Sequence, residues 1–133
     1  MLSSSGRIAQ SQIAANFTLL NHTNGQPVRL YDLVGSIIVL EFFWTECGYC
    51  QVTTPQVKTG VKEYFQNIAG NTDGLPVTVL YVAYRDGQPA SRVDWFMQTF
   101  GADFVVDDTP QNSVWYQFGN EHVPRFVVIN GVT

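Results

Sequence analysis

The two cysteines of the chain, Cys47 and Cys50, stand where a strand pattern gives way to a helix pattern. The stretch Ile37–Trp44 is rich in β-branched and aromatic residues without polar alternation, which is typical of a strand covered on both faces. Beyond the cysteines, apolar residues recur at helical spacing, namely Val57, Val61, Tyr64, Phe65 and Ile68. We therefore expect a C-x-x-C pair between a central strand and the first turn of a helix over Gly48–Ile68.

This position at a helix N-terminus determines the chemistry expected of the pair. The thiolate is the reactive form of cysteine, and the unpaired N–H groups and dipole of a helix N-terminus stabilise negative charge. Cys47 should be the more acidic and more exposed thiol, and Cys50, one turn further in, is close enough to attack a mixed disulfide formed at Cys47. The sequence therefore predicts a pair that cycles between dithiol and disulfide.

Zinc binding is the main alternative use of a C-x-x-C motif. A zinc site needs two further ligands, and only His22 and His122 are available as histidine ligands. We interpret both as solvated loop histidines, which favours redox chemistry. The sequence contains no G-x-G-x-x-G motif or phosphate loop, so we expect no metal, flavin or nucleotide cofactor.

Glu41 is the single charge in the apolar strand pattern. Burial disfavours an ionised carboxyl group, so its pKa should rise toward the range useful for proton transfer. We expect Glu41 to take the proton from Cys50 during its attack. The alternatives are a carboxylate at a solvated edge, or one paired with Lys58 or Lys62.

The rest of the chain alternates strand and helix patterns. Asn24-Gly25 between two short apolar runs predicts a hairpin, and Pro55 should kink the long helix. Ser91 and Asp94 resemble a capping box at the start of a further helix. The remaining expected elements are strands at Val77–Tyr84, Phe104–Val106 and Arg125–Ile129, and a helix over Pro110–Phe118 that Thr109 starts and Gly119 stops. This alternation favours an α/β sandwich with a mixed sheet.

Composition excludes several classes of protein. With 133 residues, 45% hydrophobic and 14% charged, the chain fits one globular domain and not a disordered one. A net charge of -4 provides no basic surface for phosphates, so nucleic acid is not an expected partner. The apolar run Ile37–Trp44 contains Glu41 and is far shorter than the roughly 20 residues that cross a bilayer.

The two ends of the chain carry separate expectations. Residues 1–13 are expected to form a flexible arm, and residues 14–133 one domain. The arm has no apolar core of the signal-peptide kind, which fits either a cytoplasmic protein or one that has lost a leader. Asn130-Gly131 resembles a hairpin turn with almost no residues after it, so the domain looks truncated. The strand Arg125–Ile129 would then be an open edge, and we expect this chain to self-associate more than a longer one in sedimentation.

These residues together resemble thioredoxin-fold thiol-disulfide oxidoreductases, in particular the TlpA/ResA group, which is related to AhpC/TSA proteins. The resemblance covers nearly the whole chain after residue 14. It is carried by Asn16–Leu19, the L-x-D-L-x-G step at Leu30–Gly35, the C-x-x-C motif, Pro55 five residues after Cys50, and Val123-Pro124 before an apolar strand.

The resemblance implies a thioredoxin-like α/β sandwich with a central mixed sheet, an N-terminal hairpin and an inserted αβ unit. The C-terminal strand and helix of that family are expected to be missing from this chain. It implies a cis peptide at Val123–Pro124, whose loop faces the cysteines and lines a substrate groove with Trp44 and Tyr49. Glu41 stands where thioredoxin carries its buried acid. The implied partners are protein thiols and disulfides and an upstream dithiol donor or acceptor, in an extracytoplasmic bacterial compartment.

The chain departs from this family pattern beside the cysteines. Glu46 replaces the usual tryptophan before Cys47, and a carboxylate there opposes thiolate formation. Two other functions stay open. The entry hairpin is also similar to that of thiol peroxidases, although Trp44 stands where those enzymes need Thr or Ser. A non-enzymatic module would use the groove only to hold a partner.

Overall fold

The computed structural model describes residues 3–4, 16–84, 89–108, 113–118 and 122–132, and the strands within these ranges form one mixed sheet. Their order in the sheet is β1-β7-β4-β5-β6-β2-β3. The bounds are β1 Ser3–Ser4, β2 Thr18–Asn21, β3 Pro27–Arg29, β4 Ile37–Phe43, β5 Val77–Tyr84, β6 Val105–Asp108 and β7 Arg125–Asn130. Strands β4, β5 and β6 run parallel, and the remaining pairs are antiparallel. The predicted α/β architecture is confirmed.

Strand β4 is covered on both faces, as its apolar pattern predicts. Successive side chains of a strand point to opposite faces, so Ile38, Leu40 and Phe42 pack into one buried cluster while Phe43 packs into the other. The first cluster includes residues of α4 (Ser113–Gln117), and the second includes residues of α1 (Gly48–Val57) and α3 (Ala90–Phe100). Each fully buried side chain of this kind contributes about 1.5–3 kcal/mol.

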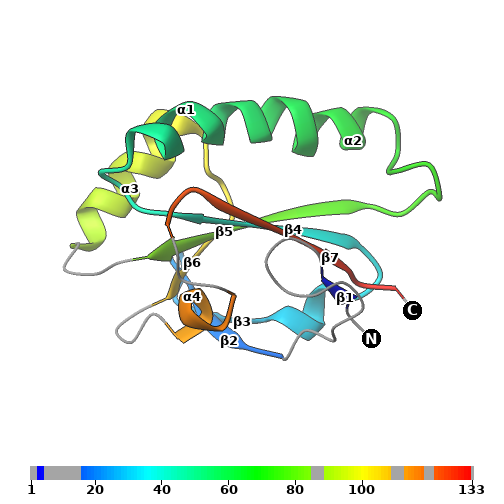
Figure 1. Cartoon of the computed structure of the whole chain (residues 1–133), viewed down its shortest axis with the longest axis horizontal. Coiled ribbons are helices and arrows are strands. Elements are labelled where there is room, and N and C mark those ends of the chain that lie inside the picture. The colour runs from blue at the N-terminus through cyan, green and yellow to red at the C-terminus, as the bar shows by residue number, and fades with distance from the viewer. Residues whose placement is uncertain (1–2, 5–15, 85–88, 109–112, 119–121, 133) are drawn as a thin grey trace.

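The helical segment after the cysteines runs along one face of the sheet (Figure 1). It consists of α1, the π-helical η2 (Lys58–Glu63) and α2 (Tyr64–Asn67). Pro55 lies inside α1, and the irregular stretch begins three residues later. Tyr64 and Ile68 are 53% and 54% exposed, so the prediction that they share the packed face is wrong. The wider π turns change the helical register after Val57, which rotates these two residues out of line.

Helix α3 packs on the same face of the sheet as α1. Val93 and Phe96 are buried, and the Phe96 ring stacks on Phe43 with centroids 4.4 Å apart. The predicted capping box at Ser91 is wrong, because α3 begins at Ala90 and no side chain caps it. Pro89 supplies the extended N-cap residue instead.

Helix α4 covers the other face, beside the hairpin β2–β3 (Figure 1). The Asp108 carboxylate accepts hydrogen bonds from the N–H groups of Val114 at 3.2 Å and Trp115 at 2.6 Å. Asp108 therefore stabilises the start of this helix, by the same interaction that an N-cap residue makes. The predicted start at Thr109 and stop at Gly119 lie outside the described residues.

The segment after β7 continues beside the segment that precedes β4. Asn130 is the last strand residue, the Gly131 N–H donates to the Ser36 carbonyl at 3.0 Å, and Gly35 donates to Gly131 at 3.1 Å. Gly131 therefore pairs with the segment before β4, and the hairpin predicted at Asn130-Gly131 stays a prediction because its return strand would lie outside the described residues.

The outer edge of β7 is partly covered by β1. Ser3 pairs with Asn130 and Ser4 with Ile129, whereas the sequence predicted an open edge. The rest of the predicted arm lies outside the described residues, and the division into arm and domain stays a prediction. Among the described helices, none has both the length and the apolar character needed to span a membrane.

Candidate active site

The cysteine pair lies where β4 ends and α1 begins. Cys47 is the N-cap residue of α1, and its Sγ accepts a hydrogen bond from the Cys50 N–H at 3.0 Å. The two residues form a disulfide, with Cα atoms 5.2 Å apart. Cys50 is fully buried whereas Cys47 is partly exposed. The predicted difference in exposure is therefore confirmed, and the N–H groups of the first helical turn are available to stabilise a Cys47 thiolate.

A loop 76 residues further along the chain faces the outer sulfur. The Val123–Pro124 peptide is cis, as the resemblance implied, and the Val123 carbonyl oxygen lies 3.6 Å from Cys47 Sγ. In the reduced protein a Cys47 thiol could donate a hydrogen bond to this oxygen. The Val123 side chain is partly buried and packs against both buried clusters, which fixes the loop relative to β4 and α1.

Of the other predicted groove residues, Trp44 and Tyr49 lie close to the cysteines in the chain, and Pro124 belongs to the cis-proline loop. Tyr49 is 78% exposed, and Trp44 and Pro124 are partly buried. The Trp44 indole Nε1 is buried without a hydrogen-bond partner among the described residues. That these residues contact a partner protein stays a prediction.

Glu41 lies on the face of β4 that α1 covers and is fully buried. Thr54 Oγ1 donates a hydrogen bond to Glu41 Oε2 at 2.5 Å, while Oε1 has no partner. Thr54 is four residues after Cys50, so both project from the same side of α1. Burial raises the pKa of Glu41 to about 7, against the smaller lowering effect of the Thr54 hydrogen bond. The expectation of a raised pKa is confirmed.

The surroundings of Glu41 differ from both alternatives. The carboxyl group is not at a solvated edge, and Lys62 pairs with Asp103 instead. Tyr81 lies opposite Glu41 in the β4–β5 register, and its buried hydroxyl has no hydrogen-bond partner within the described ranges. Burial and the Glu41 charge raise the pKa of Tyr81 well above its ordinary value. Tyr81 therefore stays neutral beside Glu41.

Arg92 is a residue of this region that the sequence did not reveal. Its Nη2 forms an ion pair with Glu46 Oε1 at 2.5 Å, and its Cζ lies 4.1 Å from the centre of the Trp95 ring. Arg92 and Glu46 are 46 residues apart, so no local spacing rule connects them. The carboxylate beside Cys47 is therefore paired with a cation.

His22 is not the solvated loop residue that the sequence predicted. Its Nε2 lies 2.7 Å from Asp94 Oδ1, its Nδ1 lies 2.9 Å from Asp107 Oδ2, and its side chain is 4% exposed. Because β2 pairs with β6, His22, the residue directly after β2, reaches the Asp107 carboxylate on β6. His122 is exposed, as predicted. Both ring nitrogens of His22 are thus occupied by carboxylates away from the cysteines.

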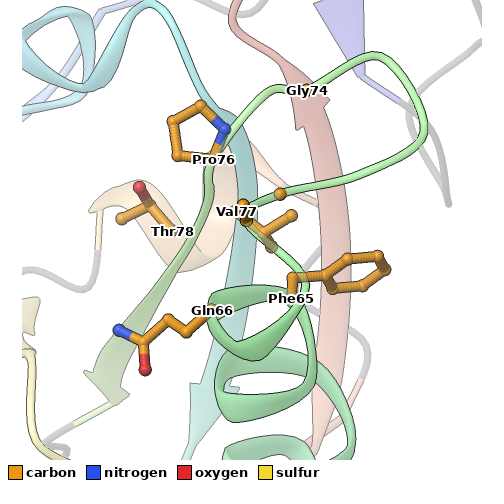
Figure 2. A pocket seen from close by; sticks show the side chains of 8 residues that line it. Phe65, Gln66, Gly74, Pro76, Val77 and Thr78 are labelled. Atoms are coloured by element: carbon orange, nitrogen blue, oxygen red, sulfur yellow. The ribbon is translucent and has the colours of Figure 1, made fainter.

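A cavity of about 470 Å³ lies at the other end of the sheet (Figure 2). Its lining comes from α2, the loop after it and the start of β5, and the labelled side chains are Phe65, Gln66, Gly74, Pro76, Val77 and Thr78. None of the cysteine-site residues lines it. The pocket is therefore separate from the candidate active site.

No family model matches this chain. A curated relative, the thiol-disulfide oxidoreductase ResA of Bacillus subtilis, is 27% identical over 123 residues. The alignment covers 92% of this chain and 63% of ResA. The chain thus spans less than two thirds of the length of this relative.

Solved structures share the architecture described above. The thioredoxin domain of a thiol-disulfide oxidoreductase from Bacteroides vulgatus matches with a TM-score of 0.68, covering 91% of this chain and 81% of that domain at 16% identity. The chain has the thioredoxin fold. A secreted Mycobacterium tuberculosis disulfide oxidoreductase also matches, with a TM-score of 0.62 and 20% identity, over 84% of this chain and 74% of that one. Within this thioredoxin fold, the cysteines follow β4 and the cis-proline loop precedes β7.

Proposed function

We propose that this chain is a thiol-disulfide oxidoreductase that exchanges electrons with partner proteins through Cys47 and Cys50. The observation that carries the proposal is a disulfide at the N-terminus of α1, whose outer sulfur faces the Val123 carbonyl and whose inner sulfur is buried. The similarity to ResA supports the same activity. The exchange needs two sulfurs and a proton acceptor, so the proposal includes no metal, flavin or nucleotide.

In the oxidised state, the outer sulfur is the one that a partner can reach. A partner thiolate attacks Cys47 Sγ, a new S–S bond forms, and the bond to Cys50 breaks. Cys50 leaves as a thiolate and takes a proton from neutral Glu41. A second partner thiolate then attacks the mixed disulfide and releases Cys47, so the partner loses two electrons as it forms its own disulfide.

In the reduced state, the same steps run backwards. The Cys47 thiolate attacks a partner disulfide, and one partner sulfur leaves and takes up a proton. Cys50 gives its proton to ionised Glu41 and attacks Cys47, which releases the second partner sulfur. A pKa of about 7 allows Glu41 to act in either direction near neutral pH.

The proposed partners are proteins that offer a thiol pair or a disulfide, and a second dithiol protein that restores the starting state. The exposed Tyr49, with Trp44, Val123 and Pro124, is the proposed surface against which an extended partner segment lies. An extracytoplasmic bacterial location is proposed, supported by the secreted oxidoreductase of similar fold.

Reduction of insulin disulfides tests the activity. With dithiothreitol as electron donor, we expect the native chain to accelerate insulin precipitation, whereas Cys47→Ala should show only the uncatalysed rate because it lacks the attacking sulfur. A native chain that does no better than Cys47→Ala in this turbidity assay would contradict the proposal.

Two further measurements separate the alternatives. Consumption of hydrogen peroxide with a thiol reductant would favour a peroxidase. Partner binding that is unchanged in Cys47→Ala would favour a non-enzymatic binding module. Titration of the native pair against a glutathione series would then assign it to reductants or oxidants, since about 30 mV corresponds to about 1.4 kcal/mol.

A further inference from the structure

Resting on the proposed function, we propose that Arg92 is a positioning residue for the exchange reaction: its guanidinium neutralises Glu46 and so permits the Cys47 thiolate to form. Glu46 precedes Cys47 directly and its side chain is about half exposed, 47%. A like charge beside an ionising group disfavours its charged form. Left alone, Glu46 would oppose the stabilisation that the N-terminus of α1 gives to Cys47.

The contacts of Arg92 hold its guanidinium beside this carboxylate. Nη2 is 2.5 Å from Glu46 Oε1, and Cζ lies over the Trp95 ring, 4.1 Å from its centre. The side chain is 35% exposed, and its buried Nε has no hydrogen-bond partner in the part of the chain that the structure describes. Arginine stacked on an aromatic ring keeps its charge at all relevant pH values and loses little side-chain freedom when it forms an ion pair.

The fold also fixes the backbone that carries Arg92. The Arg92 N–H donates to the Pro89 carbonyl at 3.1 Å, in the first turn of α3. One turn later, Phe96 stacks on Phe43, the last residue of β4 and four residues before Cys47. Movement of α3 away from the cysteine loop would therefore break an aromatic contact in the buried cluster.

Among the described titratable groups around the cysteines, Glu46 is the carboxylate that directly precedes Cys47. The other titratable groups on the elements around the cysteines are Tyr49 on α1, His122 directly before Val123, Asp94 on α3 and Glu41 on β4. Asp94 is bonded to His22, Glu41 is buried with a raised pKa, and Tyr49 and His122 are exposed. None of these is a cation paired with Glu46, so among the described residues the neutralisation of Glu46 depends on Arg92.

The test measures the rate at which iodoacetamide alkylates Cys47 in the reduced protein, as a function of pH. Cys50 is buried, and mass spectrometry of peptides identifies the labelled cysteine. We expect Arg92→Gln to raise the pH midpoint by about one unit, which lowers the thiolate fraction below the midpoint about tenfold. Arg92→Lys keeps the cation and should retain most of the native profile, and added salt should reduce the difference.

The double variant Glu46→Gln/Arg92→Gln distinguishes charge neutralisation from a structural role. It removes the carboxylate together with its partner, so its midpoint should return close to the native value although the ion pair is absent. Arg29→Gln is a matched control, because Arg29 pairs with Asp32 on the exposed hairpin side of the chain. It should leave the Cys47 profile unchanged.

Two results would overturn the inference. One is an unchanged midpoint in Arg92→Gln, and the other is a double variant that stays shifted as far as Arg92→Gln. The alkylation profile does not depend on a partner protein. A shifted profile in a chain that fails to reduce insulin would contradict the proposed function alone, and an unshifted profile in an active chain would contradict the role of Arg92 alone.

Discussion

Replacing Cys50 with alanine is expected to trap partner proteins on Cys47. The Cys47 thiolate can still attack a partner disulfide, but without the second sulfur nothing within the chain can resolve the mixed disulfide. Turnover of insulin should fall to the uncatalysed rate while disulfide-linked adducts accumulate. Non-reducing gels after acid quenching, followed by mass spectrometry, would detect these adducts and locate the linkage at Cys47.

The control for this experiment removes both cysteines. The double variant Cys47→Ala/Cys50→Ala should form no adducts, because no thiol remains in a chain that has two cysteines. Thermal unfolding of each variant shows whether the buried alanine is tolerated. A folded Cys50→Ala chain that turns over insulin at the native rate, or that forms no adducts at Cys47, would contradict the proposed roles of the two sulfurs.

Glu41→Gln is expected to change both the pH dependence of stability and the rate of exchange. Burial raises the pKa of Glu41 to about 7 in the folded chain, from an ordinary value of 4.5. Between these values the folded state holds more protons than the unfolded state, so the free energy of unfolding falls as pH rises. The difference between 4.5 and about 7 corresponds to about 3 kcal/mol. Gln does not titrate, so this loss should be absent from the variant.

Urea unfolding of the disulfide form, measured at pH 4 and at pH 8, checks this prediction. From pH 4 to pH 8, the free energy of unfolding of Glu41→Gln should rise by about 3 kcal/mol relative to that of the native chain. Thr54→Val is the companion variant, because it removes the hydroxyl that donates to Glu41 Oε2 and lowers the pKa. It should move the pH-dependent loss to higher pH. Parallel stability curves for native and Glu41→Gln chains would show that Glu41 does not titrate in this range.

The kinetic consequence of Glu41→Gln concerns the step in which Cys50 attacks. An amide cannot accept the Cys50 proton, so release of the second partner thiol should slow on the order of 10²-fold at pH 7. Stopped-flow measurement of that release would test it, and formation of the first mixed disulfide at Cys47 should keep its native rate. Equal rates for both steps in the variant and the native chain would assign Glu41 a structural role only.

Local patterns were sufficient to predict the elements that carry the cysteines. The unbroken apolar run Ile37–Trp44 predicted a strand covered on both faces, and β4 is such a strand. A lone acid in that run had to be buried or at an edge, and its raised pKa follows from burial. These predictions succeeded because backbone periodicity and the cost of burying charge depend on neighbouring residues in the chain.

Predictions failed where a contact joined distant segments. The expected solvation of His22 ignored the carboxylates that β6 and α3 bring to it. The capping box at Ser91 failed for a local reason, because α3 begins one residue earlier than its spacing assumes. The sequence could have indicated Thr54 as a neighbour of the cysteine site, since Thr54 lies four residues after Cys50 on the same helix face. Asp108 also caps a helix across several intervening residues.

The sequence by itself determined a strand, two sulfurs and a helix in succession, because side-chain periodicity and spacing along the backbone set which groups share a turn or a face. The family resemblance implied that the Val123 loop faces the cysteines, and the tertiary structure shows that contact. Only the tertiary structure decided that Thr54 donates to Glu41 and that Arg92 pairs with the carboxylate beside the outer sulfur. Such contacts depend on how β4, β7 and the helices pack around one core, and packing brings together residues that no local rule relates.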